Sequence, residues 1–300
     1  MERQSVDASA DLVNGHRMSR LLPVARALAH GALDFLLPGA CVLCRSPHRP
    51  DVDGIVCAPC MARLVPFSYP LCDRCGHPRL SLTLPLPGER PSGAAKPLGA
   101  GTTLPPCRWC PRLDPALRAV RSVARMDSGT GGDLVHALKY QGWTRAAVPM
   151  ARRMARLDWP QDVREERAAI IPIPLSAARE RERGYNQAAL LGGRLAPFWR
   201  VPVWSDVLVR VRDTSSQVRL TPSERASNVA QAFVVPVQFQ ERLRGQHVVL
   251  VDDVITTAAT VNAAVQALMR GGARIISCVT FGRAPDPGDR TAPDSDFTRN

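Results

Sequence analysis

Residues 247–260 read His-Val-Val-Leu-Val-Asp-Asp-Val-Ile-Thr-Thr-Ala-Ala-Thr. The apolar run 248–251 is typical of a buried strand, and it leads directly into the paired carboxylates Asp252 and Asp253. A short Thr/Ala turn follows, and residues 261–270 carry the pattern of a helix that a Gly-Gly pair ends. In such a strand–loop–helix unit, the loop N–H groups and the helix N-terminus attract an anion. Carboxylates bind sugar hydroxyls and Mg²⁺, so the stretch predicts a site for a phosphorylated sugar with a metal ion.

This stretch resembles the phosphoribosyl-pyrophosphate (PRPP) motif of type I phosphoribosyltransferases, in which a strand precedes Asp-Asp, two apolar residues and Thr-Thr-Gly-x-Thr. The resemblance implies that Asp252 and Asp253 hold the ribose and act in catalysis, while the loop binds the 5′-phosphate. The loop residues concerned are Thr256, Thr257, Ala258, Ala259 and Thr260. Ala258 stands where the family prefers glycine. An ordinary β–α unit with a polar turn is the alternative interpretation.

The composition sets broad limits on the class of protein. Three hundred residues allow about two domains, and 45% hydrophobic but only 5% aromatic residues predict an aliphatic core. The net charge is +12, and Lys96 and Lys139 are the only lysines. Arginine suits bidentate phosphate contacts, although a GC-rich genome gives the same bias. A basic protein also attracts polyanions without any specific site.

Eight of the nine cysteines form four Cys-x-x-Cys pairs. Each pair can chelate zinc through two thiolates, and two pairs complete a closed tetrahedral site. The pattern therefore predicts two structural zinc ions, with redox or disulfide chemistry as the alternative. We expect sequential pairing, although a cross-brace pairing is also compatible with the spacing. Sequential pairing groups Cys41, Cys44, Cys57 and Cys60 in one site and Cys72, Cys75, Cys107 and Cys110 in the other.

Targeting signals are not evident in the sequence. The first twenty residues are polar and charged, unlike a signal peptide, and charged residues interrupt the most apolar span, 21–38. We therefore expect no integral membrane association. Reduced, metal-bound thiols are typical of a cytoplasmic protein, which is the localisation we predict.

A second informative stretch covers residues 172–187, Pro-Ile-Pro-Leu-Ser-Ala-Ala-Arg-Glu-Arg-Glu-Arg-Gly-Tyr-Asn-Gln. We expect a strand to end here in a proline-stiffened loop that carries Arg179 and Arg183 towards a new helix. Such a loop could hold a pyrophosphate leaving group, and a salt-bridged helix start is the alternative. A third polar loop, 213–220, could fold over a bound phosphate.

Taken together, these residues resemble the ComF family, which joins an N-terminal double zinc ribbon to a C-terminal phosphoribosyltransferase-like domain. The resemblance covers about residues 20–283. Besides the cysteine pairs and the Asp-Asp loop, it rests on Leu138-Lys139-Tyr140, Pro172-Ile173-Pro174, Arg183-Gly184-Tyr185-Asn186-Gln187 and Arg210. It implies an α/β, Rossmann-like fold with a mostly parallel sheet, whose ligand crevice lies at the carboxyl ends of the strands. It also implies a link to natural transformation, the uptake of single-stranded DNA.

The expected organisation follows from these features. We predict a disordered start, an amphipathic helix with the double zinc ribbon, a phosphoribosyltransferase-like domain and a disordered tail. Their expected bounds are 1–19, 20–115 with a flexible insertion at 78–106, 116–283 and 284–300.

Three functions are compatible with the sequence. The first is Mg²⁺-dependent binding of PRPP, with Arg179 and Arg183 meeting pyrophosphate as it leaves. Whether transfer follows is open, because no general base or acceptor-selecting region is evident. The second is a non-catalytic accessory protein that contacts single-stranded DNA or a DNA-uptake helicase, and the third is a nucleotide-sensing regulator. Against strong DNA binding, the zinc region offers few aromatic residues for base stacking. They are Phe67, Tyr69 and Trp109.

Overall fold

The computed structural model of the chain describes residues 40–47, 55–67, 70–79, 107–126, 129–211 and 232–285. The described residues fall into two compact units, divided between Ala58 and Pro59. Several predictions lie outside these ranges, wholly or in large part. They are the disordered start, the amphipathic helix, the insertion, the polar loop at 213–220 and the tail. The predicted domain bounds stay predictions.

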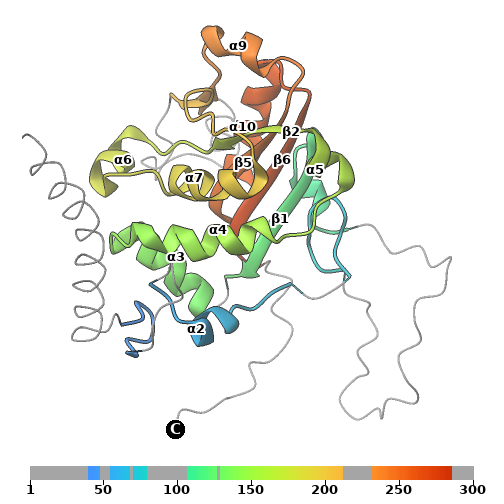
Figure 1. Ribbon diagram of the computed structural model, residues 1–300. Helices are drawn as coiled ribbons and strands as arrows, with labels where there is room; N and C mark the ends of the chain where they lie inside the picture. The colour runs from blue at the N-terminus through green and yellow to red at the C-terminus, as the bar shows by residue number, and fades with distance from the viewer. Residues whose placement is uncertain are drawn as a thin grey trace, which may run out of the picture. The chain divides into compact units, whose positions relative to one another are not determined.

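A parallel sheet is the centre of the second unit (Figure 1). Its four strands lie in the order β1 (Leu117–Arg125), β6 (Ile275–Arg283), β5 (His247–Ile255) and β2 (Arg167–Pro172). All three pairings are parallel. The two middle strands are buried along most of their length, as expected for strands covered on both faces. The prediction of an α/β fold with a mostly parallel sheet is therefore confirmed.

Helices cover the sheet on both faces. α3 (Thr130–Tyr140), α4 (Ala147–Ala155) and α7 (Gln187–Trp199) pack against β1, β2, β5 and β6. α10 (Ala259–Arg270) shares a buried cluster with alternate residues of β5 and β6, including Leu250 and Cys278. Alternate side chains of a strand face opposite sides of a sheet, which places α10 on its own face. Cys278 is fully buried, as expected for a core residue.

Short elements complete the described chain. They are α2 (Ala58–Ala62), η1 (Cys110–Arg112), η2 (Thr144–Ala146), α5 (Gln161–Glu166), α6 (Ala177–Arg183), β3 (Val209–Arg210), β4 (Phe233–Val234) and α9 (Val237–Leu243). β3 and β4 pair antiparallel. Within the described part of the chain, no helix is both long and apolar enough to cross a bilayer.

The strand that carries the carboxylates is longer than predicted. β5 does not end at Val251 but continues to Ile255, because Val254 and Ile255 pair with Gly282 and Arg283 of β6. β-branched residues favour this extended backbone. The two carboxylates therefore belong to a paired strand, whose backbone is held in place by its neighbour.

The predicted loop between β2 and α7 is wrong in its conformation, because residues 177–183 form α6. The side chain of Ser176 caps this helix by accepting a hydrogen bond from the N–H of Arg179. The helix ends at Gly184, which has the left-handed φ of 79°. Alanine, arginine and glutamate are good helix formers. A serine cap and a terminal glycine were thus visible signals of a helix.

Candidate functional site

A cavity of about 370 Å³ opens where β5 and β2 reach their carboxyl ends. This is the edge at which open α/β sheets bind ligands. Five of the predicted site residues line it: Arg179, Asp252, Asp253, Thr256 and Thr260. The other lining residues are Met126, Gly132, Val135, Lys139, Ile173, Pro174, Leu175, Gln187, Arg210 and Val254. The structure therefore brings the two informative stretches of the sequence to one place.

Lys139 reaches Asp253 inside the cavity. Its Nζ lies 2.9 Å from Oδ2 of Asp253, and the two side chains are 22% and 3% exposed. The sequence had marked Lys139 only as part of the family resemblance, and not as a site residue. The available signal was its rarity, since it is one of two lysines in an arginine-rich chain. Lys139 supplies a cation to a pair of adjacent carboxylates.

Asp252 has a different environment from Asp253. It is half-buried, and its Oδ1 accepts the backbone N–H of Asp253 at 2.8 Å. Burial raises the pKa of Asp252 to about 8, and the adjacent charge of Asp253 acts in the same direction. The backbone hydrogen bond and Lys139 oppose this rise in pKa. The balance of these effects favours a proton on Asp252 in the free protein.

This raised pKa makes stability depend on pH. The ordinary pKa of an aspartate is about 4, so folding favours the protonated form of Asp252. The stability that follows is fully present below pH 4 and is lost as the pH rises through about 8. We expect Asp252→Asn to gain stability relative to the wild type across this range. Urea unfolding at pH 5 and pH 8 measures the gain, and the exposed Asp158→Asn is the control. A difference that does not change with pH would contradict the assignment.

The loop after β5 contains a strained alanine. Ala258 has φ of 65° and ψ of −1°, and it is buried. The four residues around it, Thr256, Thr257, Ala259 and Thr260, are all exposed. Thr256 and Thr260 line the cavity, and Thr257 and Ala259 are not among the lining residues. A left-handed alanine costs about 1–2 kcal/mol. The loop thus adopts the conformation for which glycine is the preferred residue.

The two predicted arginines lie in different surroundings. Arg179 lines the cavity. Arg183 is absent from the described lining; it donates a hydrogen bond to Oε1 of Gln187 and lies over the ring of Tyr140, 5.4 Å from the ring centre. Because Gln187 lines the cavity, Arg183 contacts a wall of the site. Its contact with pyrophosphate stays a prediction.

The residues after Arg183 build the corner between α6 and α7. The hydroxyl of Tyr185 donates to the carbonyl of Leu138 at the end of α3. The side chain of Asn186 caps α7 and also donates to the carbonyl of Ile173, 3.0 Å away. This corner therefore ties three elements together at the cavity. The sequence therefore marked the right segment, but Tyr185 and Asn186 act by fixing the backbone that lines the cavity.

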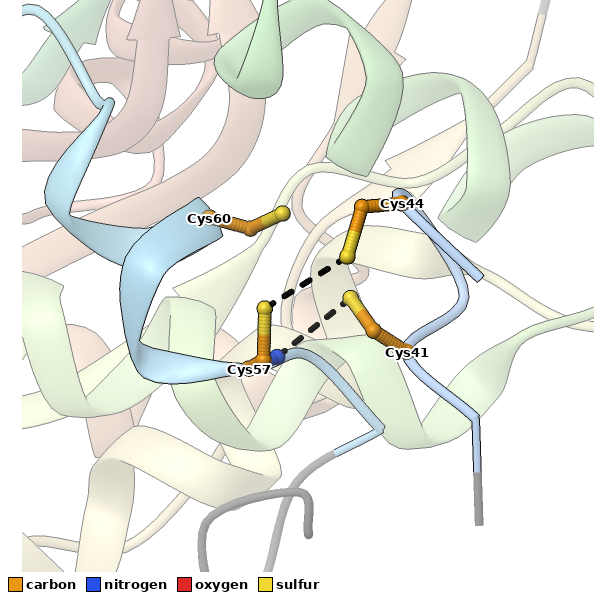
Figure 2. Close-up of side chains that lie close together, drawn as sticks. All are labelled: Cys41, Cys44, Cys57 and Cys60. Carbon is orange, nitrogen blue, oxygen red and sulfur yellow. Dashed lines mark hydrogen bonds between the residues drawn. The ribbon is translucent and has the colours of Figure 1, made fainter. Parts of the chain in front are cut away.

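The cysteines form two groups, Cys41, Cys44, Cys57 and Cys60, and Cys72, Cys75, Cys107 and Cys110. This is the sequential pairing. In each group the sulfur atoms lie within 4.8 Å of one another, and no disulfide links the described cysteines. Figure 2 shows the four side chains of the first group turned towards one point. Three Sγ–Sγ distances are 3.4, 3.5 and 3.7 Å. A tetrahedral zinc–thiolate site with bonds of about 2.3 Å has edges of about 3.8 Å, so both groups fit zinc.

The second cysteine group belongs to the core of the α/β unit. Cys72, Cys75 and Trp109 share one buried cluster with residues of the sheet. Arg74 donates to the carbonyls of Leu117, Cys110 and Asp114, at 3.2, 3.4 and 2.7 Å. Trp109 is 1% exposed, so it cannot offer a face to a nucleic-acid base. Tyr69, another expected stacking residue, lies outside the described residues.

Comparison with known proteins agrees with this architecture. Residues 32–96 match the double zinc ribbon domain, and residues 203–299 match the phosphoribosyl transferase domain. The DNA utilization protein YhgH of Salmonella typhimurium is 33% identical over 251 residues, which cover 80% of this chain and 95% of that protein. The chain belongs to the ComF family.

Other ComF-family relatives carry names connected with competence. Competence protein F of Haemophilus influenzae is 36% identical over 138 residues, which cover 46% of this chain and 57% of that protein. Competence protein ComFC of Bacillus subtilis is 29% identical over 116 residues, which cover 38% and 44%. Among solved structures, a glutamine PRPP amidotransferase from B. subtilis covers 44% of this chain and 25% of its own, with a TM-score of 0.31 and 16% identity. That similarity is too low to add to the assignment.

Proposed function

We propose that this ComF-family protein binds PRPP together with Mg²⁺ in the cavity and can pass the phosphoribosyl group to an acceptor. The observation that carries the proposal is the meeting of Asp252, Asp253, Thr256, Thr260 and Arg179 around one opening. The two carboxylates would hold the ribose hydroxyls and stabilise the positive charge that develops on the sugar ring as pyrophosphate leaves.

The remaining groups would bind the two ends of the ligand. The N–H groups of residues 256–260, at the start of α10, would hold the 5′-phosphate. Arg179 would meet the pyrophosphate with two parallel hydrogen bonds, with Arg183 next to it. Carboxylate oxygens are the ligands that Mg²⁺ accepts. Since Lys139 already neutralises Asp253, the site suits a metal ion that enters with the phosphates of its ligand and neutralises them.

Calorimetry with PRPP and Mg²⁺ tests this function. We expect the wild type to bind and the Asp252→Asn/Asp253→Asn variant to lose at least about a hundredfold in affinity, because two hydrogen-bond acceptors for ribose are weakened. Asp206→Asn is a suitable control, since Asp206 is 53% exposed and pairs with Arg242 at 3.8 Å. Absence of binding by the wild type, or equal binding by the double variant, would refute the ligand assignment.

Ala258→Gly should tighten PRPP binding. Glycine lets the ligand approach the backbone more closely. Ala258 already has the left-handed φ in the free protein, so relief of its cost, about 1–2 kcal/mol, appears in the stability of the fold, reduced by loss of a buried methyl group worth about 1 kcal/mol. Titration of both proteins with PRPP and Mg²⁺ measures the change in affinity. Unchanged or weaker binding would mean that the loop is built around alanine or does not hold the phosphate.

A second candidate function is the handling of single-stranded DNA without turnover, in the cytoplasm and beside a helicase partner. The names of the relatives, which refer to competence and DNA utilization, favour this candidate, as does the net charge of +12. Binding of a single-stranded oligonucleotide that weakens steeply with salt would support it. Nucleotide sensing is a third use of the same cavity, and it predicts binding without consumption of PRPP.

A further inference from the structure

Two large aromatic side chains stand exposed at the end of α3. Tyr140 is 70% exposed and Trp143 is 44% exposed. In the described part of the chain, Phe198 is the only other aromatic residue among the exposed large hydrophobic side chains. Tyrosine and tryptophan usually bury most of their surface. Two of them exposed within four residues indicate a surface that meets a partner.

The local backbone explains why these rings are presented together. Gly142 adopts a left-handed φ of 70°, which turns the chain back so that the N–H of Trp143 bonds to the carbonyl of Ala137 at 3.2 Å. His136 lies one helical turn before Tyr140, and their ring centres are 5.1 Å apart. We call His136, Tyr140 and Trp143 the aromatic rim.

Positive charge accompanies the aromatic rim. The guanidinium of Arg183 lies over the ring of Tyr140. Lys139 is neutralised by Asp253. Apart from this pair, the described segments from α3 to η2 and along α6 carry four cations, Arg145, Arg179, Arg181 and Arg183, against three carboxylates, Asp133, Glu180 and Glu182. These segments therefore combine π-faces with a small excess of positive charge, as single-strand binding surfaces do.

The aromatic rim is continuous with the cavity. Lys139, the residue before Tyr140, lines the cavity and pairs with Asp253. Arg183 contacts Tyr140 on one side and Gln187, another lining residue, on the other. A molecule seated on the aromatic rim would thus extend to the opening of the site.

We propose that the aromatic rim binds single-stranded nucleic acid, with bases stacked on Tyr140 and Trp143 and phosphates near Arg183. The chemistry favours a strand over a free base, because small-ligand sites bury 70–90% of the ligand, whereas these rings lie open. It favours a strand over a peptide, because stacking faces and phosphate-binding arginines occur side by side. This inference rests on the DNA-handling function proposed above and assigns it to the end of α3 and to α6 instead of the cysteine groups.

Fluorescence anisotropy with labelled 20-mers of deoxythymidine and of uridine tests the proposal. Base–aromatic stacking contributes about 1–3 kcal/mol per base, so Tyr140→Ala/Trp143→Ala should weaken binding at least about tenfold. Tyr140→Phe/Trp143→Phe keeps both π-faces and should bind within about threefold of the wild type. Phe198→Ala removes a ring that is 54% exposed on α7 and should change nothing. Thermal unfolding of each variant checks the fold.

The possible outcomes test the aromatic rim and the DNA-handling function separately. Loss of binding in the alanine variant alone supports the aromatic rim, and the tighter of the two 20-mers identifies the polymer as DNA or RNA. Wild-type binding that the alanine variant retains would overturn the aromatic rim while leaving DNA handling in place. No binding of either 20-mer by the wild type would overturn both. Capture of a protein or peptide, with no binding of either strand, would also overturn the proposal.

Discussion

Replacing Cys75 with serine should destabilise the whole α/β unit by at least about 3 kcal/mol and lower its Tm by about 6–12 °C. A structural zinc ion contributes its binding free energy to folding, and serine is a poor ligand for zinc. The size of the effect follows from position, because Cys75 is fully buried in the cluster that also contains sheet residues. Loss of this zinc would therefore leave part of the sheet without support.

Contacts around the second cysteine group explain why the effect should spread. Arg283, at the end of β6, is 2% exposed and donates to the carbonyl of Cys75. Its guanidinium also lies 4.4 Å from the ring centre of Trp109. A zinc ion with four thiolates carries a net charge of −2, which a buried cation compensates. Without the zinc ion, the buried guanidinium of Arg283 loses the fixed negative charge of the zinc–thiolate group that compensates it.

The first cysteine group provides the matched control. Cys44 is exposed, and none of the four cysteines of the first group belongs to the buried cluster that contains the sheet residues. Cys44→Ser should therefore lose one zinc ion and leave the main unfolding transition within about 1 kcal/mol of the wild type. Scanning calorimetry combined with zinc analysis measures both quantities. Equal destabilisation by Cys44→Ser and Cys75→Ser would show that burial of Cys75 in the core does not determine the size of the effect.

The parts of the site that could be predicted are those formed by residues that follow one another in the sequence. A strand, two carboxylates, a threonine-rich loop and a helix follow one another along the chain, and a Cys-x-x-Cys pair is a ligand set by itself. The extra length of β5 was not predictable, because it depends on pairing with Gly282 and Arg283. α6 was predictable from its serine cap, and the sequence offered a helix start here only as the alternative to a phosphate-binding loop.

Residues that act across the fold were harder to find. Lys139 meets Asp253 only because α3 packs against the sheet, and no spacing rule connects two residues so far apart in sequence. Gln187 likewise lines the cavity because α7 starts beside β2. The position of Trp143 at the end of α3 depends on a turn at Gly142. In each case the motif marked the right segment, and the tertiary structure determined which of its side chains faces the site.

Lys139→Met should destabilise the protein by about 3–5 kcal/mol at neutral pH, because it leaves the buried carboxylate of Asp253 without its cation. The ion pair is 2.9 Å long, and only 3% of the Asp253 side chain is exposed. The Lys139→Met/Asp253→Asn variant removes both charges and should recover most of the loss. Urea unfolding of the wild type, the two single variants and the double variant gives the coupling energy between the two side chains.

The same variants distinguish a structural pair from a functional one. If Lys139 serves as the resident cation of the site, its removal leaves two adjacent carboxylates that attract a divalent ion. Lys139→Met should then bind Mn²⁺, followed by electron paramagnetic resonance, more tightly than the wild type in the absence of PRPP, and added Mn²⁺ should restore part of its stability. Destabilisation without any gain in Mn²⁺ affinity would mean that Lys139 only holds α3 against the sheet. A gain in affinity would instead show that the positive charge of Lys139 keeps a divalent ion off the two carboxylates in the free protein.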